Sequence, residues 1–195
     1  MSDHYFTPRP TSGTDRRVLT EAILDLRLTF VTDAGVFSGE RIDPGTRLLL
    51  ERLPPLSGEA LDLGCGWGAA GVTLAKAMPE LKLTMTDVNT RALKLARENL
   101  KMNGVQAETL ESDGFAALQG RWFDAILTNP PIRAGKETVY RLLGESRLHL
   151  KAGGALYAVI RKQQGADSAF RFLESVFTEV SVLKKSGGYT VFQAR

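Results

Sequence analysis

From Glu59 onward, strand-like segments alternate regularly with segments that carry helix signals. The strand candidates are residues 59–65, 81–87, 107–112, 123–129 and 155–161. The helix candidates are residues 69–77, 90–102, 137–150 and 168–176. Residues 179–185 and 188–194 resemble a closing hairpin. This alternation predicts an α/β fold, in which a seven-stranded, mostly parallel sheet carries helices on both faces and ends in an antiparallel hairpin.

The N-terminal part of the chain follows a different pattern. Residues 1 to about 17 are polar and contain Pro and Gly, so we expect no regular structure there. Residues 22–32 alternate apolar and polar side chains, which predicts one half-buried strand. Val36 and Phe37 are candidates for the beginning of a partner strand. Asp43 followed by Pro44 is typical of a helix cap and a first helical turn.

We therefore expect two parts in the chain. Residues 1–55 would form a small strand-and-helix extension, packed on a larger unit that comprises residues 56–195. The chain has 195 residues, of which 43% are apolar and 24% charged, so it can bury one sizeable core.

Composition excludes some classes of protein. The net charge of +3 is compatible with an RNA partner but too small to indicate one. The single cysteine, Cys65, excludes an internal disulfide. The sequence has no signal-peptide core and no apolar run of membrane-spanning length, so we expect a cytoplasmic protein. His4 and His149 have no Cys or His partners at metal-ligand spacing, and no metal site is expected.

The stretch LDLGCGWG places three glycines between a strand and a helix. Gly64, Gly66 and Gly68 allow positive φ and a close backbone approach to a ligand. The spacing Gly64-x-Gly66-x-x-Ala69 fits the dinucleotide fingerprint. S-adenosylmethionine (SAM) is a second candidate ligand, and a tight turn without a ligand is a third interpretation.

Two acids help to separate these ligands. Asp62 stands two residues before the first glycine, at the end of the strand. A carboxylate there is unfavourable beside a pyrophosphate but suits a cation, and SAM carries an ammonium and a sulfonium without a phosphate. Asp87 ends the next strand, where it can bind a ribose hydroxyl unless it faces solvent. The pair favours SAM.

Two further strand ends carry candidate site residues. Asp113 and Phe115 follow the third strand, where they would meet an adenine ring by hydrogen bonding and packing, although a plain turn fits almost as well. Pro130 and Pro131 lack N–H groups and must end the preceding strand. Asn129 is thereby left at a carboxyl strand end, where α/β sheets bind ligands.

In this order on successive strands, LDLGCGWG, TDVN, SDGF and TNPPI resemble the motifs of class I SAM-dependent methyltransferases. Within that class the chain is similar to the small-domain amino-methyltransferases, typified by the 16S rRNA guanine-N2 methyltransferases of the RsmC type. Residues 35–50 and 128–136 extend the similarity, which begins at about Thr32. The resemblance implies a Rossmann-like fold, SAM as cofactor and methyl transfer to guanine N2 in ribosomal RNA. We expect a monomer or weak homodimer.

The resemblance also implies roles for individual residues. The cofactor would be bound by Phe37, Asp62, Gly64, Cys65, Gly66, Gly68, Asp87, Val88, Asp113, Phe115 and Asn129. Asn129, Pro130 and Pro131 would form the catalytic motif. The Asn129 side-chain oxygen and the Pro130 carbonyl would accept the two hydrogens of a planar NH₂ group and orient its lone pair. No strong base is then required.

The residues after this motif bear on the substrate. Ile132 stands where many relatives carry an aromatic residue that would stack on the target, which weakens the inference to a flat purine. Arg133 and Lys136 are candidates for contacts with RNA phosphates. Three alternatives stay open: a protein glutamine-N5 methyltransferase, a non-catalytic SAM- or RNA-binding domain, and an NAD-dependent oxidoreductase, which Asp62 disfavours.

Overall fold

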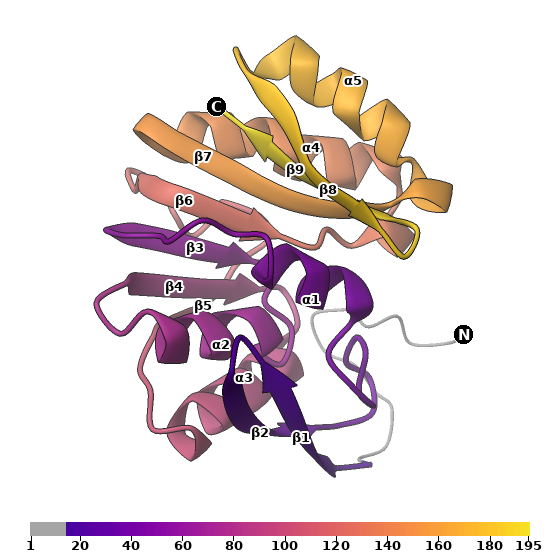
Figure 1. Ribbon diagram of the computed structural model, residues 1–195. Coiled ribbons are helices and arrows are strands. Elements are labelled where there is room, and N and C mark those ends of the chain that lie inside the picture. Colours follow the sequence, from indigo (N-terminus) through magenta and orange to yellow (C-terminus); the bar gives the residue numbers. More distant parts are fainter. Residues whose placement is uncertain (1–14) are drawn as a thin grey trace.

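The computed structural model describes residues 15–195. Its main sheet has seven strands in the order β5-β4-β3-β6-β7-β9-β8 (Figure 1). The strands are β3 (Glu59–Leu63), β4 (Lys82–Asp87), β5 (Glu108–Glu111), β6 (Phe123–Thr128), β7 (Leu150–Arg161), β8 (Val180–Ser186) and β9 (Tyr189–Ala194). Strands β3 to β7 are parallel, and β9 is antiparallel to both of its neighbours. The predicted Rossmann-like α/β fold with its closing hairpin is confirmed.

Helices cover both faces of the sheet. Helices α1 (Pro44–Leu50), α2 (Ala69–Ala77) and α3 (Thr90–Met102) pack on one face, and α4 (Lys136–Ser146) and α5 (Ala166–Val176) on the other. Successive strand residues face opposite sides, so Ala60 belongs to the hydrophobic cluster under α1–α3, whereas Leu61 belongs to the cluster under α4 and α5. This double burial explains the continuous apolar runs in the central strands, at residues 125–127 of β6 and 155–160 of β7.

The predicted helix starts are confirmed where a side chain caps them. The Asp43 carboxylate accepts a hydrogen bond from the Thr46 N–H at the start of α1. The Asn89 side chain accepts from two N–H groups, those of Arg91 and Ala92, at the start of α3. These local hydrogen bonds satisfy N–H groups that have no partner inside the helix.

The N-terminal strands differ from the prediction. The single strand expected at 22–32 is wrong, because the chain forms a hairpin of β1 (Arg17–Ile23) and β2 (Leu26–Thr32). Leu24 and Asp25 form its two-residue turn with φ values of 49° and 59°. Such turns usually carry Asn or Gly, and that signal is missing here.

Two related predictions concern the neighbouring residues. No strand forms at Val36–Phe37, since the partner of β2 lies upstream of it. The prediction that residues 1 to about 17 lack regular structure falls outside the described residues for positions 1–14, and β1 already includes Arg17.

The helix predicted at 137–150 is too long. α4 ends at Ser146, a 3₁₀ turn follows at Arg147–His149, and Leu150 begins β7 by pairing with Phe123. Leu150 is buried in the same cluster as α4, so apolar spacing alone could not reveal that it belongs to a strand. The other short 3₁₀ turns lie at Ile132–Ala134 and Lys162–Gln164.

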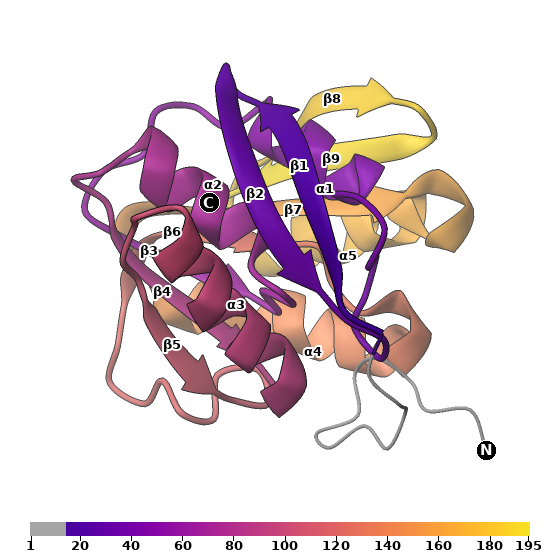
Figure 2. The same cartoon turned by 90° about the horizontal axis from the view of Figure 1, so that it is seen from below.

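The hairpin of β1 and β2 lies beside α3 (Figure 2), and Asn99 of α3 and Asn103, which follows its last residue, bond to β2. The Asn99 side chain accepts from the Val31 N–H at 2.6 Å and donates to the Val31 carbonyl at 2.9 Å. One helical turn later, Asn103 makes the same pair of bonds with Thr29. Each amide thus completes the hydrogen bonding of a β2 residue as a neighbouring strand would.

The hairpin, α1 and the sheet share one hydrophobic cluster, to which Phe30, Leu49 and Ala60 contribute. The division of the chain at residue 55 therefore stays a prediction. Within residues 15–195, no helix has the length and apolar character needed to cross a membrane.

We expect Asn99→Leu to lower the free energy of unfolding by about 3–5 kcal/mol, because it leaves buried polar groups of Val31 and Trp67 without a partner. Urea denaturation followed by circular dichroism measures this change. Lys101→Ala, at an exposed position of the same helix, should change stability by less than about 0.5 kcal/mol. Similar losses in the two variants would show that the amide contacts do not hold the hairpin.

Candidate active site

A cavity of about 380 Å³ opens at the carboxyl ends of the parallel strands. Its walls come from β3, β4, the turn after β5, the loop after β6 and α4. Eight of the predicted site residues line it: Phe37, Gly64, Asp87, Val88, Asp113, Asn129, Pro130 and Pro131. The strand-end argument from the sequence therefore brings half of the candidate residues to one place.

The glycine loop forms the floor at β3. The N–H groups of Gly64 and Cys65 both donate to the Thr86 carbonyl at 2.8 Å, which ties the loop to β4. Gly64 has a φ of 75°, and a Cβ there would meet no atom within 4 Å. A side chain at this position would therefore be strained and would extend into open space. Gly66 and Gly68 line neither this cavity nor its smaller neighbour, and act by shaping the loop.

Asp87 is held rigidly at the end of β4. Its two carboxylate oxygens accept from the N–H groups of Gly66 and Asn89, each at 2.8 Å. Burial raises the pKa of Asp87, while hydrogen bonds from the backbone of Asn89, Gly66 and Val88 oppose that shift. The carboxylate oxygens have lone pairs left, so Asp87 can accept further hydrogen bonds from hydroxyl groups in the cavity.

Asp62 lies deeper, in a second cavity of about 50 Å³. Phe37, Gly64 and Asn129 line both cavities, so the two adjoin. Asp62 is 4% exposed, and its Oδ2 atom has no hydrogen-bond partner within residues 15–195. A buried carboxylate oxygen without a donor is suited to a cationic ligand group.

Burial raises the pKa of Asp62 to about 7. A hydrogen bond from the Gly71 backbone opposes this shift, and the negative charge of Asp87 adds to it. Burial also raises the pKa of Cys65 well above its ordinary value, and the nearby Asp62 and Asp87 act in the same direction. Cys65 lines the second cavity as a buried thiol with a raised pKa, which makes it a poor nucleophile.

The SDGF turn contributes one of its two candidates to the cavity. Asp113 lines the cavity and forms an ion pair of 2.6 Å with Arg141 of α4. Phe115 is 3% exposed, packs in the hydrophobic cluster under α4 and stacks on His149 at a ring distance of 4.4 Å. Phe115 therefore does not line the cavity. Its position in the hydrophobic cluster does not support the expected packing on an adenine ring.

Asn129 stands at the junction of the two cavities. Its amide nitrogen donates to Asp43 Oδ2 and to Thr46 Oγ1, both at 3.0 Å. Pro130 and Pro131 continue the wall of the main cavity. The sequence identified Asp43 only as a helix cap and did not identify Thr46, because nothing local links them to a residue more than eighty positions away.

The three candidates for substrate binding lie outside the cavity walls. Ile132 is half-buried and packs on the cluster under α4. Arg133 is exposed, and Lys136 is exposed with its ammonium 5.0 Å from the ring centre of Tyr140. Ile132 packs on the core and therefore does not line the cavity. The aromatic residue that lines the cavity is Phe37, whose side chain is 40% exposed.

Residues 33–43 carry Phe37 past both cavities. The buried Trp67 donates from its indole N–H to the Phe37 carbonyl at 2.8 Å. The Asn89 amide donates to the Gly35 carbonyl at 3.1 Å. Sequence reasoning missed Trp67, whose role as an anchor depends on a partner thirty residues away.

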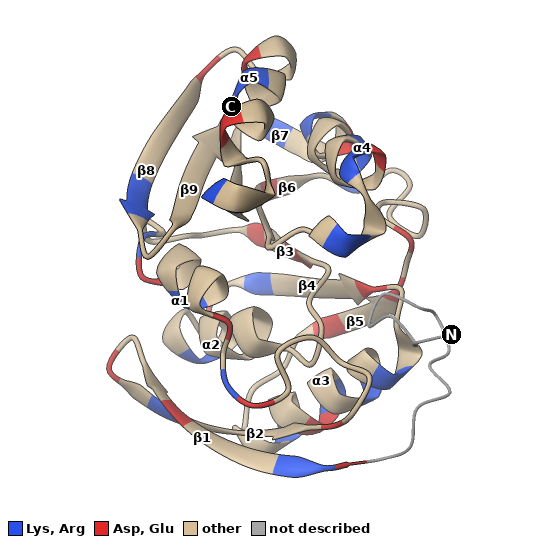
Figure 3. Cartoon of the chain, turned by 90° about the vertical axis from the view of Figure 1, so that its right-hand side faces the viewer, with Lys and Arg blue, Asp and Glu red and all other residues tan. Residues whose placement is uncertain are grey.

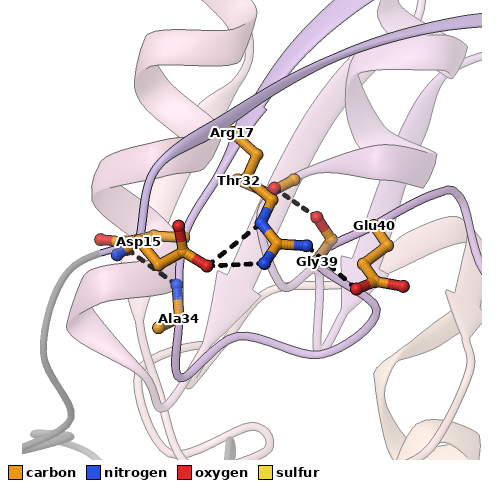
Figure 4. Close-up of polar contacts among 7 residues, drawn as sticks. Asp15, Arg17, Thr32, Ala34, Gly39 and Glu40 are labelled. Atoms are coloured by element: carbon orange, nitrogen blue, oxygen red, sulfur yellow. Dashed lines mark hydrogen bonds and ion pairs between the residues drawn. The ribbon is translucent and has the colours of Figure 1, made fainter.

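Polar contacts also fix the base of this segment (Figure 4). Arg17 of β1 bridges the carboxylates of Asp15 and Glu40 with nitrogen–oxygen distances of 2.7 and 2.9 Å. The Thr32 hydroxyl donates to the Gly39 carbonyl. Contacts from β1 and β2 therefore hold the residue 33–43 segment, which borders the site, in place.

The described residues contain no group of three or more His, Cys, Asp or Glu side chains placed to hold a metal ion.

Residues 27–193 match the family model of the methyltransferase small domain. The chain belongs to this family.

Two curated relatives are similar to this chain over most of its length. The uncharacterised protein YbxB of Bacillus subtilis (strain 168) is 41% identical over 199 residues, which cover all of this chain and 99% of that protein. The ribosomal RNA small subunit methyltransferase C of Shewanella loihica is 39% identical over 173 residues, which cover 86% of this chain and 49% of that enzyme.

Among solved structures, the T. thermophilus 16S rRNA N2 G1207 methyltransferase (RsmC), in complex with AdoMet and guanosine, aligns with a TM-score of 0.85 and 28% identity. The alignment covers 95% of this chain and 52% of that one. This small-domain chain thus spans about half the length of the methyltransferase C relatives that it matches.

The raised pKa of Asp62 predicts a pH-dependent stability of the ligand-free protein. The folded-state pKa of about 7 exceeds the ordinary value of 3.8, so the unfolded chain releases this proton first. The stabilising contribution is complete below about pH 4 and is lost as the pH rises through about 7. Asp62→Asn should therefore become progressively more stable than the native protein over this range, by up to about 4 kcal/mol.

Urea denaturation between pH 5 and pH 8 measures the effect. Asp25→Asn is the matched control, because it removes an exposed carboxylate from a turn that Asn tolerates. Parallel pH profiles for Asp62→Asn and the native protein would mean that Asp62 stays ionised in the folded, ligand-free state.

Proposed function

We propose that this chain is a SAM-dependent methyltransferase acting on the exocyclic N2 amine of a guanine in ribosomal RNA. The observation that carries the proposal is that Asn129 and Pro130 line the same cavity as Gly64 and Asp87. The names of the methyltransferase C relatives support ribosomal RNA as the substrate. The T. thermophilus structure with AdoMet and guanosine supports guanine.

The residues of the two cavities fit SAM in charge. Asp62, with its unpartnered Oδ2, would hold the ammonium group, and Asp87 would hold the ribose hydroxyls. Asp113 would lie at the adenine end, and Phe37 would cover the cofactor. The buried carboxylate of Asp62 and the half-buried one of Asp87 would repel a pyrophosphate, which argues against a dinucleotide. When bound, SAM supplies a methyl group activated by its positively charged sulfur.

The chemistry left to the protein is the orientation of a weak nucleophile. The lone pair of a guanine amine is delocalised into the ring, so the nitrogen must be held in a reactive geometry. Asn129 Oδ1 and the Pro130 carbonyl would accept its two hydrogens and favour a pyramidal nitrogen. These hydrogen bonds strengthen as positive charge develops on the nitrogen, which lowers the barrier. No side chain needs to act as a strong base.

Basic residues at the carboxyl ends of the strands, the end of the sheet that carries Asn129, support an RNA substrate. β8 runs parallel to β7, because both are antiparallel to β9, and therefore ends at the edge that carries Asn129. Arg161 and Lys162 lie at the end of β7, and Lys184 and Lys185 near the end of β8. All four are exposed. Figure 3 looks toward this edge and shows basic residues at the end of β8 and on α4.

These cations would contact the phosphates that flank the target nucleotide, together with Arg133 and Lys136. The cytoplasmic location and the monomeric or weakly dimeric state remain predictions that accompany this function.

Asn129→Ala should reduce the rate of methyl transfer about 10²–10³-fold, because one of the two acceptors for the amine is lost. Its affinity for SAM should change little, since the cofactor would be held mainly by Asp62, Asp87 and the glycine loop. Tritiated SAM with ribosomal RNA from a strain that lacks the protein, followed by nucleoside analysis, measures turnover. Calorimetry measures SAM binding.

Gln193→Ala is the control, because it removes an amide that bonds Tyr157 outside the cavity. Label found in protein instead of guanine would favour the glutamine methyltransferase. Failure of the native protein to bind SAM would contradict the proposed function altogether.

Replacing cations at the carboxyl edge should weaken RNA binding in a salt-dependent way. We expect Lys162→Glu/Lys185→Glu to reduce the slope of log affinity against log salt by about 2, the number of phosphate contacts removed. The matched variant Lys82→Glu/Lys101→Glu makes the same change in charge away from this edge, at the start of β4 and the end of α3. Fluorescence anisotropy with labelled RNA compares them, and equal losses would argue against a binding edge.

A further inference from the structure

The start of α1 holds the side-chain amide of Asn129 in one orientation. Asn129 Nδ2 donates to Asp43 Oδ2 and to Thr46 Oγ1, both at 3.0 Å. These bonds use both hydrogens of the amide nitrogen. Within residues 15–195 no hydrogen bond to the Asn129 side-chain oxygen is formed, and that oxygen is not one of the buried atoms without a partner. It is therefore available to a group in the cavity that Asn129 lines.

The two ends of an amide have opposite hydrogen-bonding properties. If the NH₂ end of Asn129 faced the cavity, its hydrogens would oppose the hydrogens of an amine substrate. An ionised carboxylate can only accept hydrogen bonds, so Asp43 disfavours that orientation by repelling the amide oxygen. Asp43 thus selects the orientation in which Asn129 presents an acceptor.

We propose that Asp43 and Thr46 are positioning residues that lock the Asn129 amide with its oxygen toward the substrate amine. The inference rests on the proposed function, since it assigns that oxygen to the amine. Neither residue needs to touch the substrate. Both act through Asn129.

The packing of α1 makes this lock rigid. A Cβ at Gly45 would lie 2.7 Å from a ring atom of Tyr189 and 2.9 Å from Asp43 Oδ2, so only glycine lets the helix start fit between β9 and Asn129. Arg47 then ties the helix to the hairpin through an ion pair of 2.7 Å with Glu21. The N-terminal segment therefore fixes the orientation of a side chain on β6.

Asp43 also caps α1 with the same oxygen that holds Asn129. Asp43→Asn alone can keep the cap, because Asn is as good a cap as Asp when its oxygen takes the place of Oδ2. If its NH₂ group takes that place, it can donate to position 129 but the Thr46 N–H loses its cap, so a test must compare variants by urea denaturation as well as by turnover.

The decisive experiment exchanges the donor and the acceptor. Asn129→Asp places two carboxylates in contact and should lose most turnover. In Asp43→Asn/Asn129→Asp, the NH₂ group introduced at position 43 would take the place of Oδ2 and donate to the new carboxylate, whose second oxygen would face the cavity, while the Thr46 N–H loses its side-chain cap. We expect this double variant to turn over at least about tenfold faster than Asn129→Asp, a coupling of the size seen for residues in contact.

A second readout does not depend on activity. The Asn129 side-chain amide, assigned in ¹⁵N NMR spectra by its loss in Asn129→Asp, should exchange its hydrogens slowly with water. Thr46→Val removes one acceptor at nearly constant shape and should speed this exchange at least about fivefold, the effect of one hydrogen bond. Thr46→Ser restores the hydroxyl and should restore protection.

The outcomes separate this inference from the proposed function. A rapidly exchanging Asn129 amide in the native protein overturns the lock, whatever the enzyme methylates. A native protein that methylates guanine, but whose double variant is no more active than Asn129→Asp, overturns the positioning role. A protected amide in a protein that leaves RNA unlabelled contradicts the proposed function while supporting the lock itself.

Discussion

Side-chain amides hold the N-terminal segment of this molecule against the sheet. Asn99 and Asn103 satisfy the backbone of β2, Asn89 holds the Gly35 carbonyl and Asn129 binds the start of α1. An amide carries both a donor and an acceptor, so it can replace a backbone partner where no strand is present. These contacts decide where residues 33–46 lie, and so they decide the shape of the cavity beside them.

The two halves of the site therefore have different origins. The cofactor half is built from consecutive strand ends, where β3 supplies Asp62 and the glycine loop and β4 supplies Asp87. The substrate half depends on a contact between Asn129 and a helix that precedes the sheet in sequence. A perturbation of the hairpin would reach the second half first, because Arg47 and Glu21 connect the hairpin to α1.

This difference explains what the sequence could and could not predict. Caps such as Asp43 and Asn89, strand ends such as Asn129, and the alternation that gives the sheet all depend on neighbours along the chain, and these predictions were correct. The turn at Leu24–Asp25 carries no glycine or asparagine, so the hairpin was read as one strand. Local patterns also cannot give the direction of a side chain in a turn, which is why Phe115 was assigned to the cavity although it packs on His149.

The distribution of charge follows from the two ligands that we propose. SAM is cationic and RNA is anionic, and one surface could not attract both. Here the carboxylates of Asp62 and Asp87 lie inside the two adjoining cavities, with Asp62 buried and Asp87 half-buried, while Lys162 and Lys185 are exposed near the ends of β7 and β8. Exposed cations act on a polyanion over the Debye length of about 8 Å at physiological salt, whereas the acids act most strongly on a group that enters the cavity. Opposite signs at different depths would let a chain with a net charge of only +3 bind both proposed partners at the carboxyl ends of the strands.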